Sequence, residues 1–448
     1  MGWVRELVPA RNRTAIVWIA IALIAGIVVK LGWALTRARY FGTGEASYIA
    51  LALAEGRGFA DGFVAGQGPT AHLLPVSPAI AGAVYWLLGP RSMAAEVVLF
   101  LWAIGLAAFC YVIFARVALR LGVPRGWALA ALLFLWGVPI YTSAEVFDFR
   151  VWEGALALAL GSALLFLVVR ADAGERPRGF LFWLSVLPAA TFFVNGPVGL
   201  AAVAAWGLFL WRNRRAVPVF RVMVATAAAL VLIVAPWTAR NWIVMGHPIL
   251  LRDNLGMELA VANHPGAVDP ADPAEAFRER LVAIQPYLHP GAYARLQAAG
   301  GEVAYSKQLG AEAKAWMAAN PRAVARLWTT HVREMLFTRS WMFKTRKSVA
   351  LPLVRSAIMT FVGLAALLGL ALAAVRRDGR YFYMAAFAIV PVLVYVPFQP
   401  IPRYTWLIYP ALTCMATDAL ARAAAAVRRR RAAARTGVAP RRDLPAHG

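Results

Sequence analysis

The sequence predicts an all-α polytopic membrane protein, a bundle of about ten transmembrane helices with two external loops that carry surface helices. Hydrophobic residues make up 61% of the 448 positions and charged residues only 15%, more apolar material than a soluble domain can bury. Apolar runs long enough to cross a bilayer recur along the chain, and clusters of arginine separate them. These three observations define the fold class.

The net charge of +24 could also indicate a nucleic-acid-binding protein. The arginines, however, fall between the apolar runs, as the positive-inside rule requires of cytoplasmic loops. We therefore expect no nucleic acid among the partners and expect membrane lipids instead. The clusters are Arg11 and Arg13, then 116–125, 170–178, 212–221, 376–380 and 428–442.

The apolar runs predict the spanning helices directly, using a length of about 20 residues as the guide. Placing the N-terminus inside puts every arginine cluster in the cytoplasm, provided that the apolar run 75–89 does not span. At about 15 residues between prolines, that run is better interpreted as a helix on the outer membrane surface. The predicted spans are 14–36, 95–116, 127–142, 150–169, 180–195, 197–211, 222–237, 351–375, 381–397 and 404–425.

This topology divides the chain into five parts and predicts a multi-pass inner (plasma) membrane protein with both termini cytoplasmic. The second external part is far more polar, and 274–288, 302–320 and 322–337 have the pattern of amphipathic helices. Mass gathered in two loops on one side is more typical of an enzyme than of a transporter with paired halves. The parts are a cytoplasmic segment 1–13, a transmembrane region 14–238 with external loop 37–94, an external helical region 239–350, transmembrane helices 351–425 and a basic cytoplasmic tail 426–448.

The first external loop contains Glu45 and Tyr48, one helical turn apart and flanked by glycines. One interpretation makes Glu45 an ordinary first-turn acid, favoured by the helix dipole and capped by Thr43. The other makes it a general base aimed at an acceptor hydroxyl, because the glycines let a bulky substrate approach. The pattern leaves both open.

The stretch 141–154 is the second cluster of ionisable residues, at a turn back into the bilayer. Charges at membrane depth are costly and usually mark function, which makes Glu145 and Asp148 candidate catalytic carboxylates facing the first loop. The alternative is internal pairing, in which Arg150 neutralises Asp148 or Glu153. Lys30 is expected to extend outward from the first helix to the membrane surface.

Two arginines on the predicted outer side run against the usual charge bias. Arg240 is followed by Asn241, and Arg403 by Tyr404. Cations in these places suit a phosphate or pyrophosphate headgroup, although interfacial anchoring is the competing interpretation. Asn263 follows in the same external region.

No metal or cofactor site is expected, although the sequence leaves a divalent metal possible in principle. The only cysteines, Cys110 and Cys414, lie in apolar runs, and the histidines are too scattered for a ligand set.

Several motifs in series resemble the GT-C glycosyltransferases, the group of protein O-mannosyltransferases, lipid A aminoarabinose transferase and glycosyltransferase family 39. "GEASYIALALAEGRGF" and "GPTAHLLPVSPAIAGAVYWLLG", which contains His72, are similar to that family's first external loop. "YTSAEVFDFRVWEG" is similar to its Ser-Glu-rich turn. "APWTARNWIVMGHPILLRDNLG", "AVANHP" and "PRYTWLIYPAL" are similar to its later segments, in the same order.

The sequence departs from the family pattern at two places in the presumed active centre. The family's first-loop aspartate falls at Gly44, which leaves Glu45 beside it, and "P-P-G-Y-P" is reduced to "LPVSP" at 74–78. Either Glu45 has taken over, or the acceptor needs little help from a base, or catalysis is lost.

The resemblance implies transfer of a sugar, with inversion, from a polyprenyl-phosphate carrier to a lipid, glycan or protein acceptor at the outer face. Glu45, with Asp148 and Glu145 as the other candidates, would accept the acceptor proton. Tyr48, His72, Asn241, Asn263 and Tyr404 would line the substrate site, and Arg240 and Arg403 would bind the phosphate. The alternatives are an inactive lipid-binding relative and a flippase or transporter of lipid-linked sugars.

Overall fold

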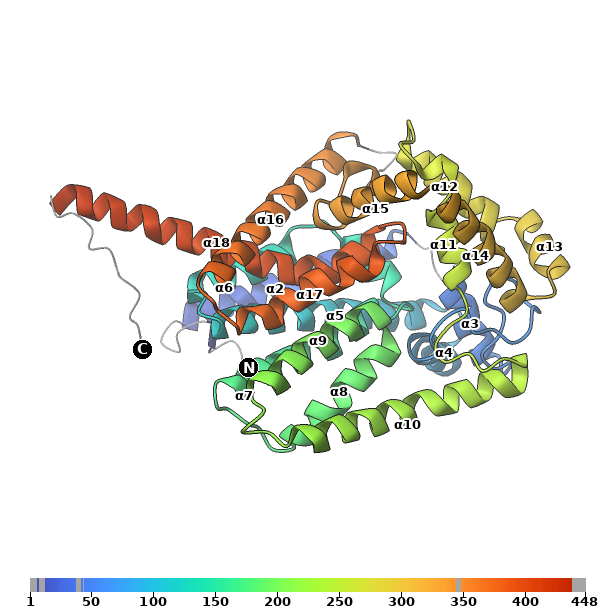
Figure 1. The fold of residues 1–448 in the computed structure, drawn as a ribbon, viewed down its shortest axis with the longest axis horizontal. Helices are drawn as coiled ribbons and strands as arrows, with labels where there is room; N and C mark the ends of the chain where they lie inside the picture. Colours follow the sequence, from blue (N-terminus) through green and yellow to red (C-terminus); the bar gives the residue numbers. More distant parts are fainter. Residues whose placement is uncertain (1–5, 8–12, 38–41, 43, 344–347, 437–448) are drawn as a thin grey trace.

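The computed structural model describes residues 6–7, 13–37, 42, 44–343 and 348–436. In these ranges the regular structure is helical, with one isolated bridge between Ala60 and Pro69 and no strand. Figure 1 shows a bundle of long helices with a layer of shorter helices at one end. The predicted all-α class is confirmed.

Within the described residues, ten apolar helices form the bundle and match the ten predicted spans. Five of them are long and apolar enough to cross a membrane, by length and composition: α2, α5, α7, α10 and α16. The ten are α2 (Arg13–Leu35), α5 (Met93–Arg120), α6 (Arg125–Gly137), α7 (Gly154–Asp172), α8 (Phe180–Val194), α9 (Gly196–Arg212), α10 (Val219–Met245), α16 (Ala350–Val375), α17 (Tyr381–Tyr395) and α18 (Pro402–Thr436).

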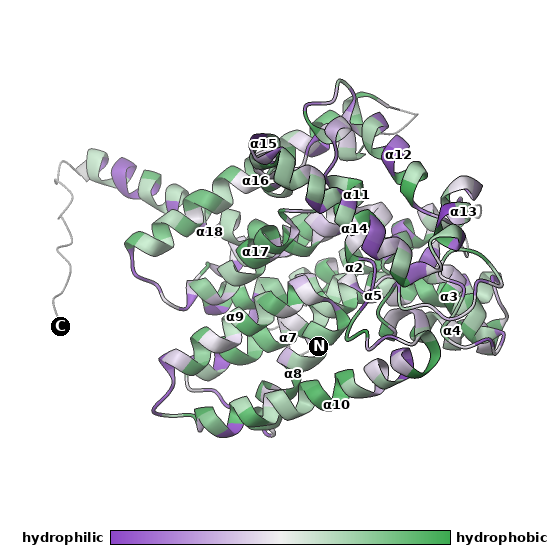
Figure 2. Ribbon diagram, turned by 45° about the vertical axis from the view of Figure 1, so that its right-hand side comes forward, coloured by the Kyte–Doolittle hydropathy of each residue, from purple (hydrophilic) through white to green (hydrophobic). Residues whose placement is uncertain are grey.

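Burial differs sharply among the spanning helices. In the apolar window of α7, 72% of residues are buried by protein, against 6% in α10. Helix α7 is therefore central, while α10 exposes large apolar side chains such as Leu232 and Ile243. An apolar helix that protein leaves uncovered needs hydrocarbon around it. Figure 2 shows the bundle helices mostly hydrophobic along their length, in agreement with membrane lipids as surroundings.

The shorter helices form a layer at one end of the bundle, which we call the cap (residues 44–92 and 246–343). Its first part pairs α3 with α4, and in its second part α11 packs on α14. The surface helix predicted at 75–89 and the three predicted amphipathic helices are all present. The cap helices are α3 (Glu45–Ala54), α4 (Val76–Leu88), α11 (Leu255–Ala262), α12 (Pro273–Ile284), α13 (Pro290–Ala298), α14 (Glu302–Ala319) and α15 (Pro321–Leu336), with short 3-10 turns η3 (Pro265–Ala267) and η4 (Ser340–Phe343).

Helix α10 is longer than predicted. Its apolar run was expected to end at 237, but the helix continues to Met245 and carries Arg240 and Asn241 in its last turns. Trp237 packs with the first loop, Arg240 donates to its carbonyls, and Asn241 donates to the carbonyl of Ile249, so these side chains are held by protein contacts. The expected boundary at 239 therefore falls inside a helix.

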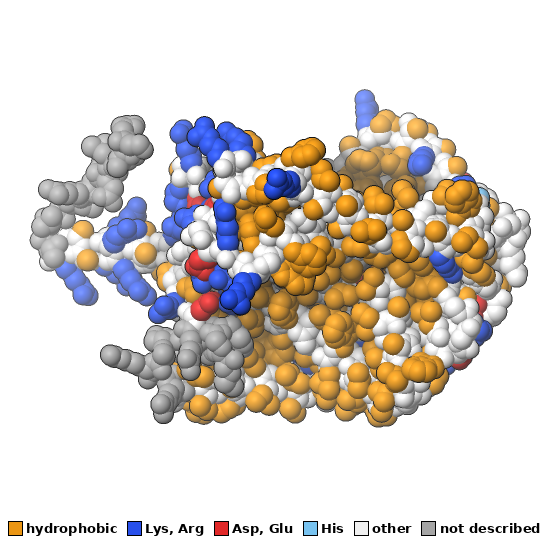
Figure 3. All heavy atoms as spheres, turned by 90° about the horizontal axis from the view of Figure 1, so that it is seen from below, with side chains coloured by type: hydrophobic (Ala, Val, Ile, Leu, Met, Phe, Trp, Pro, Cys, Tyr) orange, Lys and Arg blue, Asp and Glu red, His pale blue; other side chains and the backbone are white. Residues whose placement is uncertain are grey.

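The end of the bundle opposite the cap carries most of the basic side chains. Figure 3 shows Lys and Arg gathered at that end and a broad hydrophobic surface over the middle of the molecule. Helix α18 contributes by running past the bundle with exposed Arg428–Arg431. The rest of the predicted basic tail, from 437, and most of the predicted N-terminal segment lie outside the described residues.

Candidate active site in the cap

Glu45 and His72 meet at the centre of the cap's first loop. Glu45 is the first residue of α3, is only 5% exposed, and lies 3.1 Å from His72 Nε2. Gly44 is the N-cap residue and supplies no side chain, while Thr43, the predicted cap, lies outside the described residues. Glu45 is thus held by a tertiary contact with a histidine, which neither interpretation of the sequence included.

His72 is surrounded by acids. Burial lowers the pKa of its imidazole, but the charge and hydrogen bond of Glu45, with the charges of Glu302 and Asp253, outweigh burial and raise it to about 9. The ring is therefore protonated at neutral pH, packed edge-on against Phe63 with 4.6 Å between ring centroids. A positive His72 lies 3.1 Å from the Glu45 side chain and fixes its position.

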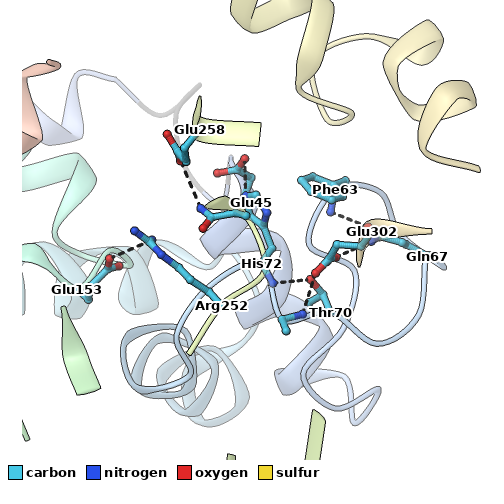
Figure 4. A network of polar contacts seen from close by, with 11 residues as sticks. Glu45, Phe63, Gln67, Thr70, His72, Glu153, Arg252, Glu258 and Glu302 are labelled. Carbon is cyan, nitrogen blue, oxygen red and sulfur yellow. Dashed lines mark hydrogen bonds and ion pairs between the residues drawn. The ribbon is translucent and has the colours of Figure 1, made fainter. Parts of the chain in front are cut away.

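Glu302, at the start of α14, joins the two parts of the cap. Its carboxylate accepts hydrogen bonds from Thr70 Oγ1 at 2.6 Å, the Ala71 amide at 2.9 Å and Gln67 Nε2 at 3.1 Å (Figure 4). No local pattern in the sequence marks Glu302, because its donors are more than 230 positions away.

Asp253 completes the acidic surroundings of His72. Burial and the charge of Glu302 raise the pKa of Asp253 to about 8, although His72 acts in the opposite direction. Neither of its carboxylate oxygens has a hydrogen-bond partner among the described residues. The group therefore holds a proton through part of the neutral range.

A cationic pocket lies where the turn before α7, the loop before α11 and the start of α18 meet. Arg252 and Arg403 line it together with Trp152, Tyr395 and Tyr404. The guanidinium of Arg403 lies 4.1 Å from the centre of the Trp152 ring, and Tyr404 stacks on Tyr395 at 4.4 Å. Planar guanidinium groups on aromatic walls are well suited to phosphate oxygens.

The local structure explains the charge of this pocket. Arg403 is the second residue of α18, a 35-residue helix whose positive dipole end therefore faces the pocket. Arg252 lies 3.7 Å from Glu153, which leaves its charge only partly neutralised (Figure 4). Arg403 and Tyr404, which the sequence predicted as substrate-binding residues, both line this pocket, and Arg252, which the sequence did not single out, lines it with them.

Glu145 and Asp148 lie three residues apart on the π-helical turn η2 (Ala144–Asp148) and have different surroundings. Asp148 is half-buried, interacts electrostatically with Arg403 and Arg150, and forms no ion pair within 4.0 Å among the described residues. Arg403 also interacts electrostatically with Glu45. The structure therefore brings Asp148, Glu45 and Arg403 into one electrostatic neighbourhood.

Glu145 is occupied elsewhere. It is buried, and it accepts short hydrogen bonds from Lys30 Nζ and the hydroxyl of Tyr111, which in turn accepts from Trp406 Nε1 at 2.7 Å. The predicted outward course of Lys30 is wrong, because a buried carboxylate neutralises the ammonium inside the bundle. Because Lys30 and Tyr111 occupy its carboxylate oxygens, Glu145 is not available to accept a proton from a substrate.

Within the described part of the chain, Arg150 forms its close ion pair with neither Asp148 nor Glu153, the partners that the alternative interpretation offered. Its guanidinium lies 3.1 Å from Glu96, which accepts a further hydrogen bond from the hydroxyl of Tyr85 at 2.7 Å. Glu153, the other proposed partner, pairs with Arg252. The Arg150 network ties α4 and α5 to the turn that carries Asp148, and so positions that carboxylate indirectly.

Three predicted substrate-binding residues instead hold the cap together. Arg240 donates to the carbonyls of Phe59 and Thr70, the latter at 2.7 Å, so its donors face the first loop and not the pocket. Asn241 donates to the Ile249 carbonyl at 2.9 Å.

Asn263 is similarly committed, donating to Pro397 O at 2.8 Å and accepting from Trp328 Nε1 at 3.0 Å. Buried groups whose hydrogen bonds are satisfied by protein have little capacity for a ligand. Tyr48 is half-buried and lies one helical turn after Glu45 on α3. It interacts electrostatically with Tyr287.

Comparison with known proteins gives one distant structural likeness. No protein-family model matches the sequence, and no curated protein matches it. Among solved structures, the chain is similar to the archaeal oligosaccharyltransferase AglB from Archaeoglobus fulgidus, solved in complex with an inhibitory peptide and a dolichol-phosphate. The TM-score is 0.49 and the sequence identity 11%, with 95% of this chain and 52% of that chain covered. This chain spans about half the length of that protein.

The chemistry available in the cap is that of carboxylates beside two arginines. In the described part of the chain, no three His, Cys, Asp or Glu side chains are grouped so that they could hold a metal ion. Glu302 and Glu45 already bind protein donors and His72 respectively. The arrangement can accept a proton at a carboxylate and stabilise negative charge at the arginines.

Proposed function

We propose that the protein is a glycosyltransferase that moves a sugar, with inversion, from a polyprenyl-phosphate carrier to an acceptor hydroxyl at the outer face of the membrane. One observation supports this function above all: Arg252 and Arg403 line a single pocket, and Arg403 is electrostatically coupled to the carboxylates of Glu45 and Asp148. The resemblance of the cap sequences to GT-C motifs supports the same assignment.

In the proposed reaction a carboxylate, Glu45 in the first instance, takes the proton of the acceptor hydroxyl. The acceptor oxygen forms a bond to the anomeric carbon from the face opposite the carrier. The bond between that carbon and the phosphate oxygen breaks, and its electron pair leaves with the polyprenyl phosphate. Attack from the opposite face inverts the configuration of the sugar.

The arginines act on the leaving group. Negative charge grows on the carrier phosphate as its bond to the sugar breaks, and Arg252, Arg403 and the positive end of α18 would stabilise that charge. Two guanidinium groups can do this without a metal ion, and we propose that transfer requires no bound metal or other cofactor. The polyprenyl tail would lie along the apolar surface of the bundle.

We place the cap outside the cytoplasm on the basis of charge. The basic end of the bundle satisfies the positive-inside rule only if it faces the cytoplasm, and the cap lies at the other end (Figure 3). Both termini are then cytoplasmic, and the candidate site faces outward.

The decisive assay incubates the purified full chain with a panel of polyprenyl-phosphate sugars and measures release of the free carrier phosphate. Release with sugar appearing on an added acceptor is the expected result. Donor binding without release would support the inactive relative. Movement of an intact labelled donor across vesicle membranes would support a flippase.

A further inference from the structure

A second cavity lies in the cap, apart from the candidate active site. Its volume is about 320 Å³, at the lower end of the range for small-ligand sites. It lies between η3, α12, α15 and the turn that precedes α18, and it shares no lining residue with the pocket of Arg252 and Arg403. Size and position suit one compact ligand.

His331, on α15, gives this cavity its chemical character. The side chain is only 1% exposed, and its Nδ1 lies 2.8 Å from the carbonyl oxygen of Val396. A carbonyl only accepts, so the ring proton is on Nδ1 and Nε2 keeps a free lone pair. Nε2 is buried and has no hydrogen-bond partner among the described residues. A buried acceptor without a donor is uncommon and indicates a missing partner.

Burial also fixes the charge state of this ring. It lowers the pKa of His331 to about 4, against the opposing effect of the hydrogen bond to Val396. The ring is therefore neutral at physiological pH, and Nε2 can only accept.

The other walls add a carboxylate and aromatic rings. Glu334, 3% exposed, accepts from Trp341 Nε1 at 2.9 Å and has further acceptor capacity. The rings of Phe277 and Trp341 lie 6.2 Å apart at 55° to each other and form an apolar surface. Thr330 adds a hydroxyl, which can donate or accept.

We propose that this cavity binds a neutral sugar ring. Sugar hydroxyls can donate to Nε2 of His331 and to Glu334, while the C–H face of the ring packs on the aromatic walls. The charged side chains of the lining are largely paired with one another, Arg326 with Asp269 at 2.7 Å and Arg339 with Glu334 at 4.0 Å, which favours a neutral ligand over an ion. The inference does not depend on the proposed transfer reaction.

The test measures ligand binding by saturation-transfer NMR on the full chain in lipid nanodiscs, because glycoside detergents would compete. The probes are the methyl pyranosides of glucose, mannose and galactose, with inorganic phosphate as the anionic comparison. We expect saturation of at least one glycoside at concentrations up to about 10 mM, and none of phosphate.

His331→Asn is the informative variant, because its amide can still donate to Val396 O while the acceptor at the Nε2 position is lost. We expect the affinity for the glycoside to fall about tenfold, the loss typical of one buried hydrogen bond. Arg322→Ala, on the exposed face of the same helix, should bind like the wild type. If His331→Asn does not fold, Thr330→Val takes its place, since it keeps the shape of the wall and removes the hydroxyl.

Three outcomes would overturn the proposal. They are absence of binding by every glycoside, phosphate binding that displaces the glycoside, and equal affinity in the folded cavity variant and the wild type. Because no outcome involves carrier release, failure here is distinct from failure of the proposed transfer.

Discussion

Glu45 and Asp148 are both placed near Arg403, but different contacts hold their carboxylates. Glu45 is nearly buried and bound to a protonated His72. Asp148 is half-buried and lies between the charges of Arg403 and Arg150. The contact with His72 orients the Glu45 carboxylate, whereas Asp148, which has no close ion pair among the described residues, is the less stabilised anion. Each property favours a different residue as the general base, and substitution of the two residues one at a time can distinguish them.

Replacing Glu45 with Gln keeps its size and removes its basicity. We expect turnover to fall by about 10²–10⁴-fold, the loss typical of a general base, with donor affinity close to that of the wild type. Carrier release and equilibrium donor binding measure the two quantities. Asp148→Asn is the matched comparison, and normal turnover in Glu45→Gln with loss of activity in Asp148→Asn would assign the base to the second turn.

The arginines can be separated in the same way. Arg403→Ala and Arg252→Ala should each weaken donor-lipid binding by about 1.5–3 kcal/mol, the range for charge-assisted hydrogen bonds. Arg240→Ala should leave donor affinity unchanged and lower the unfolding temperature, because Arg240 binds the carbonyls of Phe59 and Thr70. Donor titrations and thermal unfolding of the three variants test this division, and unchanged affinity in both pocket variants would contradict a phosphate site.

His72 makes the stability of the cap depend on pH. Its pKa is raised from 6.5 to about 9 in the folded state, so its contribution is complete below pH 6.5 and is lost as the pH rises through 9. The raised pKa of Asp253, about 8, acts in the same direction. Unfolding temperature should therefore decrease between pH 6.5 and 9. His72→Gln should flatten that decrease, and an identical slope in the variant would exclude His72 as its cause.

The backbone at the start of α3 requires a glycine at position 44. Gly44 has φ +92° and ψ 161°, a region that essentially only glycine occupies without strain. A Cβ at this position would meet no atom within 4 Å, so the backbone and not crowding requires the glycine. This backbone is therefore suited to Gly44 and presents Glu45 as the first residue of the helix.

An aspartate at position 44 should not raise the proposed transfer activity. Gly44→Asp should destabilise the protein by about 1–3 kcal/mol because of the strained backbone, and turnover should not rise above that of the wild type. Thermal unfolding and carrier release check both statements, with Gly56→Asp, at an exposed glycine with φ +76° that lies apart from Glu45, as the comparison. An increase in turnover would show that the loop accommodates a second acid beside Glu45.

The whole molecule is organised along one axis, from a basic end through an apolar belt to the cap (Figure 3). Reporter enzymes fused after Gly300 and after Arg431 test its orientation. The first fusion should behave as external and the second as cytoplasmic. The reverse pattern would place the cap inside the cell and exclude action at the outer face.

Helix positions follow from the sequence alone. Hydropathy and helical periodicity are local properties, and they located all ten bundle helices and the amphipathic helices of the cap. Hydropathy did not locate every helix end: α10 continues past its apolar run to Met245 and ends at Gly246, whose left-handed backbone caps it. The sequence also selected Glu45, His72, Asp148 and Arg403, which the structure places near one another.

Only the tertiary structure decided which of the ionisable residues are free to act. Lys30 and Glu145 form an ion pair although they are 115 positions apart in the sequence. Arg240 donates its hydrogen bonds to backbone carbonyls of a loop more than 160 positions away. Glu302 and Arg252 likewise enter the site through contacts with residues far away in the sequence, Thr70 and Glu153 respectively. A charged side chain has the same local pattern whether it binds substrate or protein. Its role depends on the distance to partners on other helices, and packing of the whole chain sets that distance.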